Sequence, residues 1–138
     1  MPQAGDFYEV HLPLAAVAWG DEARMTDSRP RRQGEGYIPI PRAFATEHNI
    51  VNSNGVNGGA DVLGQNLYEC ESEDGLLRGV IKAAGCPDEG DKYAKQFQGN
   101  NDLRLLGGWY QQIGAKAGDT VRVTFVSTTK VLLKYIPS

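Results

Sequence analysis

The feature that most constrains this chain is that its apolar residues come in short segments separated by turn-forming residues. Residues 120–126 (TVRVTFV) alternate between apolar and polar side chains, which is the pattern of a half-buried β-strand. Residues 67–71 and 76–83 flank an Asp-Gly turn, which predicts a β-hairpin. With further segments at 7–12, 37–40 and 131–136, the pattern predicts about seven strands. Pro39 marks the segment 37–40 as an edge strand, because proline cannot donate a ladder hydrogen bond.

Only two segments have the spacing of helices. Pro41 suits the first turn of a helix over 42–48, and Asn49 is a plausible left-handed stop. Over 102–113 apolar residues recur at helical spacing, with Gly114 as the expected stop. The expected fold is therefore mainly β, a small barrel or sandwich with two short helices.

The second helix carries two further details. Asn101 is the expected cap at its start. Gly107 and Gly108 lie inside it, and each costs on the order of 1 kcal/mol relative to alanine. Close packing of the helix against a sheet would explain why glycine stands there.

Length and composition fit one globular domain over residues 1–138. A chain of this size buries roughly 70% of its unfolded surface, so it needs no metal or disulfide to fold. The longest apolar run, 12–19, is too short to span a bilayer, so no membrane partner is expected. The first residues lack the features of a secretory signal, and the two cysteines are expected to be reduced. We therefore expect a cytoplasmic protein.

Residues that carry catalysis are few. His11 and His48 stand alone, and Cys70 and Cys86 lack the spacing of metal ligands. No serine lies in a nucleophile elbow, and the glycines of 55–64 are not followed by the Lys-Ser or Lys-Thr of a phosphate-binding loop. We expect no catalytic residue, metal ion or cofactor, and no enzyme activity of this domain alone.

A carboxylate cluster allows one catalytic alternative. Alternation in a strand places Glu69, Glu71 and Glu73 on one face, where they could bind magnesium as in a nuclease. The common nuclease site also has a lysine beside the second acid, which this segment lacks. A solvated strand face is the favoured interpretation, and a stand-alone hydrolase with its site in 67–74 is the alternative.

The charges are unevenly distributed, although the net charge is only −3. Acidic residues concentrate in 43–91 and basic residues in 92–138. Two polar segments stand out: 20–36 holds an arginine cluster around Pro30, and 82–98 holds lysines and glutamines. The arginine fork donates two parallel hydrogen bonds to guanine or phosphate. Two such segments on a rigid barrel are suited to straddling a DNA groove, and two ordinary surface loops are the alternative interpretation.

The order of several segments resembles a known family. These are 36–45 (GYIPIPRAFA), 95–97 (KQF), 102–110 (DLRLLGGWY) and 114–123 (GAKAGDTVRV). Over residues 7–136 the chain resembles the B3-like DNA-binding domains of restriction endonucleases, closest to the BfiI and NgoFVII type. The EcoRII N-terminal domain and the plant B3 domains are more distant relatives of that type.

The resemblance implies an open seven-stranded β pseudobarrel with two short α-helices. It implies sequence-specific binding in the major groove of double-stranded DNA, by an N-arm (residues 20–36) and a C-arm (residues 82–95). A nuclease domain or subunit is the implied partner, because such domains recognise the target of a restriction endonuclease. The expected DNA-binding residues are Arg24, Arg29, Arg31, Arg32, Gln33, Lys82, Asp88, Lys92, Tyr93, Lys95 and Gln96. The carboxylate of Asp88 can accept from a cytosine amino group.

A different small barrel, of swapped-hairpin or double-psi type, is the main alternative. Such a protein would serve as an interaction or regulatory module. Gly118-Asp119 before the strand at 120–126 fits it equally well, since any tight turn that feeds a half-buried strand favours such residues. Gel filtration distinguishes the two, because swapped-hairpin proteins are obligate dimers and the B3-like domain is expected to be a monomer.

Overall fold

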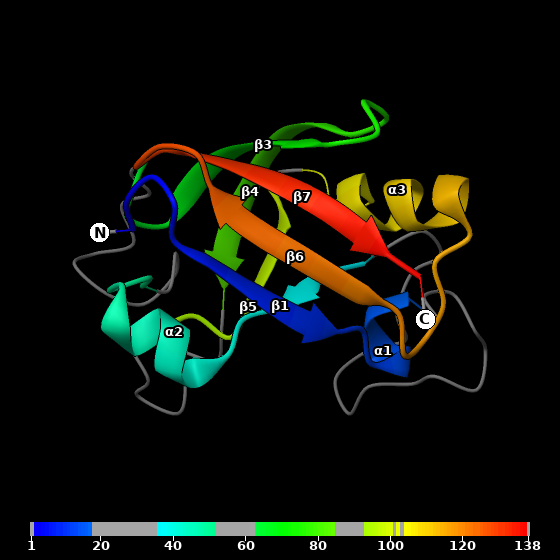
Figure 1. Ribbon diagram of the computed structural model, residues 1–138, viewed down its shortest axis with the longest axis horizontal. Coiled ribbons are helices and arrows are strands. Elements are labelled where there is room, and N and C mark those ends of the chain that lie inside the picture. The colour runs from blue at the N-terminus through cyan, green and yellow to red at the C-terminus, as the bar shows by residue number, and fades with distance from the viewer. Residues whose placement is uncertain are drawn as a thin grey trace.

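The computed structural model forms one seven-stranded mixed sheet that curls into a nearly closed barrel (Figure 1). It describes residues 2–17, 36–51, 63–84, 93–100, 102 and 104–137. The strands are β1 (Phe7–His11), β2 (Ile38–Pro39), β3 (Leu67–Ser72), β4 (Arg78–Ala84), β5 (Gln96–Gly99), β6 (Thr120–Phe125) and β7 (Lys130–Ile136). The helices are α1 (Leu14–Val17), α2 (Arg42–Glu47) and α3 (Leu105–Ile113).

The strands follow the order β1-β6-β7-β3-β4-β5-β2. Neighbours pair antiparallel except β3 and β7, which are parallel, with Glu69 opposite Lys130. β2 stands at one edge, as Pro39 predicts, and β1 stands at the other. The hydroxyl of Tyr8 in β1 donates to the carbonyl oxygen of Pro39 at 3.0 Å, so a side chain joins the two edges. The predicted mainly β barrel is confirmed.

The apolar side chains on the inner faces of the strands fill the barrel. In β6, Val121, Val123 and Phe125 are fully buried while the residues between them are half-exposed, as the sequence predicts. Tyr68 of β3 packs edge-on against Phe125 at 5.3 Å between ring centroids. Aromatic rings from distant strands therefore meet at the centre of one core.

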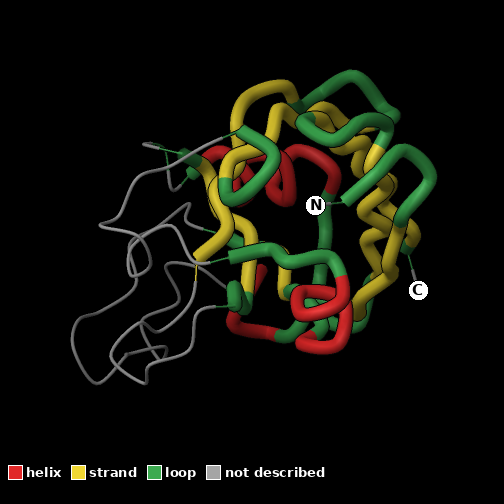
Figure 2. The backbone as a smooth tube through the Cα atoms, turned by 90° about the vertical axis from the view of Figure 1, so that its left-hand side faces the viewer, coloured by secondary structure: helices red, strands yellow, loops and turns green. Residues whose placement is uncertain are grey.

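α2 and α3 lie on opposite sides of the strands (Figure 1 and Figure 2). α2 brings Phe44 against Tyr8, with ring centroids 4.8 Å apart. Its predicted stop is confirmed, because Asn49 has a left-handed φ of 55°. α3 buries Leu106, Trp109 and other residues against the remaining core. The single turn of α1 was not predicted; it packs against α3.

The predicted start of the second helix is wrong. α3 begins at Leu105 with Arg104 as its N-cap residue, three residues later than expected, and no side chain caps it. Asp102 forms a turn instead, since its carboxylate accepts from the Arg104 amide at 3.1 Å and its carbonyl accepts from the Leu105 amide at 3.1 Å. The expected cap, Asn101, lies outside the described residues. The predicted stop at Gly114 is confirmed by its φ of 69°.

Candidate nucleic-acid interface

The structure describes four of the predicted DNA-binding residues. Lys82, Tyr93, Lys95 and Gln96 are described. The other predicted DNA-binding residues lie outside the described residues: Arg24, Arg29, Arg31, Arg32, Gln33, Asp88 and Lys92. The described part of the candidate interface therefore consists of the points where residues 18–35 and 85–92 join the barrel, and of the strand face between those points.

Both segments join the same group of neighbouring strands. Residues 18–35 lead towards β2, and residues 85–92 connect β4 to β5. β5 pairs with both other strands, with Phe97 opposite Ile38 on one side and Ala83 on the other. This places the attachment points as predicted, between the first two strands and between the fourth and fifth. The boundary of the C-arm is corrected, because β4 continues through Ala84 and so includes Lys82.

The backbone that follows residues 85–92 is held from two sides. Tyr93, which is half-buried, forms a bridge with Val51. The Ala94 amide donates to the Ile50 carbonyl at 3.0 Å. The Lys95 amide donates to the Ala84 carbonyl at 2.7 Å, and its side chain is exposed. Lys95 therefore presents an exposed basic side chain from a fixed backbone.

The outer face of β4 and β5 carries long polar side chains. Ile81, Ala83 and Phe97 point into the core, so strand alternation turns Lys82, Gln96 and Gln98 outwards. Lys82 lies opposite Gln98 in the ladder. The amide nitrogen of Gln96 donates to the amide oxygen of Gln98 at 3.1 Å. Amide and ammonium groups of this kind donate to phosphate oxygens and base edges.

Strands β2, β4 and β5 contain no aspartate or glutamate. On the other strands, Glu9 of β1 accepts from the Arg122 side chain at 2.7 Å, and Glu71 of β3 pairs with Arg78 and Lys130. Neither Lys82 of β4 nor Lys134 of β7 forms an ion pair with another described residue. The outer face of β2, β4 and β5, here called the β5 face, is therefore free of strand carboxylates and is suited to an anionic partner.

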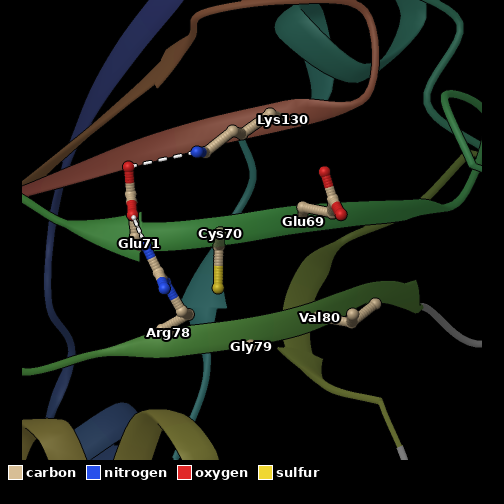
Figure 3. A pocket seen from close by; sticks show the side chains of 7 residues that line it. All are labelled: Glu69, Cys70, Glu71, Arg78, Gly79, Val80 and Lys130. Atoms are coloured by element: carbon tan, nitrogen blue, oxygen red, sulfur yellow. Dashed lines mark hydrogen bonds and ion pairs between the residues drawn. The ribbon is translucent and has the colours of Figure 1, made fainter.

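The carboxylate cluster of β3 lies next to this face and lines a pocket with Arg78 and Lys130 (Figure 3). Arg78 and Lys130 approach Glu71 from the two neighbouring strands, at 3.2 and 3.1 Å. The Lys130 ammonium and then the Arg78 guanidinium hold the pKa of Glu71 below its ordinary value. The expectation that Glu73 shares this face is wrong, because β3 ends at Ser72 and Glu73 lies in the turn.

The two histidines lie apart from the β5 face. His11 contacts the Thr120 hydroxyl at 3.0 Å, and His48 contacts the Asp6 carboxylate at 3.2 Å. Sequence reasoning missed Gly107 and Tyr110 of α3, which contact Gly36 and Tyr37, the residues that follow segment 18–35. No local signal could have found them, since they act through contacts with residues more than 70 positions away.

Within the described part of the chain, no helix is long and apolar enough to cross a membrane. Comparisons with family models, with curated proteins and with solved structures find no match for this chain.

Proposed function

We propose that this chain is a B3-like domain that binds double-stranded DNA in a sequence-specific manner. In this proposal the N-arm (residues 20–36) and the C-arm (residues 85–95, since β4 runs through Ala84) enter the major groove from the β5 face. The arginines of the N-arm read base edges and phosphates, because their planar fork suits both. Between the arms, the DNA phosphate backbone is contacted by Lys82, Lys95, Gln96 and Gln98.

One observation carries the proposal. Segment 85–92 connects β4 to β5 and segment 18–35 leads into β2, and none of these three strands contains a carboxylate. DNA binding depends on neutralising phosphates, so a surface between two DNA-binding arms must not repel the phosphates. A domain with net charge −3 can meet this requirement only on a local face.

The proposal extends to the biological setting. The domain recognises the target of a restriction endonuclease, in the cytoplasm, and a nuclease domain or subunit performs the cleavage. The domain alone leaves plasmid DNA intact in the presence of magnesium. Magnesium-dependent nicking by the purified chain, lost on substitution of Glu69 and Glu71, would instead support the hydrolase alternative.

Selection of bound duplexes from a random pool, read by sequencing, tests the specificity. The selected duplex is then titrated by fluorescence anisotropy at several salt concentrations, beside a scrambled duplex, a single strand and an RNA duplex. If about six phosphates are neutralised, the slope of log K against log salt is near −5. Equal affinity for RNA, or a slope near zero, would refute the proposal.

A matched pair of lysines tests the β5 face itself. Lys82→Ala removes one charge from this face, and Lys134→Ala removes one from β7 on another side of the barrel (Figure 1). Lys82→Ala is expected to weaken binding to all duplexes alike and to make the salt slope shallower by about one. Lys134→Ala is expected to leave both quantities unchanged. Equal effects of the two substitutions would show that the contact surface lies elsewhere.

A further inference from the structure

The described residues on either side of segment 18–35 lie against α3. α1, which precedes the segment, packs on α3, and its Ala16 is fully buried. Gly36, which follows the segment, is also buried. A Cβ atom on Gly36 would lie 2.9 Å from the Cα and nitrogen atoms of Gly107 in α3, and 3.2 Å from the Ala16 carbonyl oxygen. Three backbones therefore meet here with no space for a side chain.

A hydrogen bond from α3 holds the next residue along the chain. The hydroxyl of Tyr110 donates to the carbonyl oxygen of Tyr37 at 2.8 Å. Tyr110 is fully buried, and burial raises the pKa of its hydroxyl well above 10. The hydroxyl is therefore protonated and able to donate at neutral pH.

α3 is itself tied to the sheet on its other side. The indole nitrogen of Trp109 donates to the Asp74 carboxylate at 3.0 Å, in the turn between β3 and β4. Leu105 packs against Gly79 of β4, where a Cβ atom would lie 3.0 Å from its side chain. α3 thus connects a firmly paired part of the barrel to the backbone at residues 36 and 37.

We propose that α3 is the element that positions the N-arm, with Tyr110 and the contact between Gly36 and Gly107 as its positioning groups. This inference rests on the proposed function. Base edges are read only when an arm holds a defined register on the barrel, whereas phosphate contacts tolerate small displacements. Loosening the backbone at Tyr37 should therefore cost sequence discrimination rather than general affinity for DNA.

Two tyrosines offer a matched test. Tyr110→Phe removes the hydroxyl that donates to Tyr37, next to the N-arm. Tyr8→Phe removes the hydroxyl of another buried tyrosine, which donates to Pro39, two residues after Tyr37. Each loses one hydrogen bond and no packing volume, so urea denaturation should show similar stabilities for both. Affinities for the selected and scrambled duplexes are then measured and corrected for the folded fraction.

Tyr110→Phe is expected to reduce the ratio of selected to scrambled affinity about fivefold, as the loss of one hydrogen bond allows, with an unchanged salt slope. Amide exchange at Gly36 and Tyr37 should become faster in this variant. Tyr8→Phe should keep the wild-type ratio. If the two variants discriminate equally well, or if Tyr110→Phe weakens both duplexes alike, the inference fails while the proposed function stands. If the wild-type chain binds no duplex, both fail.

Discussion

Four glycines of this barrel form a graded series for substitution by alanine. None of them has a φ in the left-handed region, so the outcome depends on the space around the added methyl group. At Gly108 nothing lies within 4 Å of that position. At Gly79 the nearest atoms belong to the flexible Leu105 side chain, at 3.0 Å. At Gly36 they are backbone atoms at 2.9 Å, and at Gly99 the Asp102 carbonyl oxygen lies at 1.9 Å.

These distances set the expected free energies of unfolding. Gly108→Ala should stabilise the protein by up to about 1 kcal/mol, because alanine is the better helix former. Gly79→Ala should be within about 1 kcal/mol of the wild type, since the leucine can move. Gly36→Ala should destabilise by about 1–3 kcal/mol, the usual cost of overpacking. Gly99→Ala should cost about 3 kcal/mol or more, because β5 or the turn at Asp102 must shift to relieve a backbone clash.

Urea denaturation followed by far-ultraviolet circular dichroism measures the series. With a slope of about 2 kcal/mol per molar, a loss of 3 kcal/mol moves the midpoint by about 1.5 M. Gly108→Ala is the control, because it places the same methyl group in α3 without a contact. A Gly99→Ala midpoint within about 0.5 M of the wild type, or a Gly36→Ala variant as stable as Gly108→Ala, would refute the packing described for α3 and β5.

Two further predictions concern single residues of β3. The folded pKa of Glu71 is lowered, so its ion pairs stabilise the fold above the unfolded pKa near 4.5 and are lost as pH falls through the folded value. Glu71→Gln should therefore destabilise more at pH 7 than at pH 3 in urea titrations, and an equal loss at both would contradict this. Burial raises the pKa of Cys70 to about 12. In a Cys86→Ser background, Cys70 should react with a thiol reagent at pH 8 only as urea unfolds the chain, and native-state labelling at the rate of free cysteine would argue against it.

The strands could be predicted from the sequence, because the alternation of apolar and polar residues shows which side chains face the core. Val121, Val123 and Phe125 are buried as their alternation predicts, and Asn49 and Gly114 end their helices with left-handed backbones. Local pattern failed at the start of α3, where the apolar spacing extends back to Leu103. A turn replaces the first residues of the expected helix, since Asp102 bonds the amides of Arg104 and Leu105.

The sequence also located the candidate site in part. Loop composition identifies the two polar segments, and alternation turns Lys82 and Gln96 away from the core. What local pattern could not supply is the order of strands, since pairing between distant segments depends on the whole set of contacts. That order brings β2, β5 and β4 together, with the carboxylates of β3 on the neighbouring strand and that of β1 at the far edge of the sheet.

The two glycines of α3 show most clearly what local sequence determines and what depends on the tertiary structure. The sequence by itself determined that a helix ends at Gly114 and that Gly107 and Gly108 weaken it. Only the tertiary structure decided that the two differ: Gly107 meets the backbone of Gly36, and Gly108 meets nothing. The cost in helix propensity is a local property of each glycine. The reason for glycine at position 107 is not local, because it lies in the close approach of two backbones 71 positions apart, which the pairing of β2 with β5 and the packing of α3 on β5 bring together.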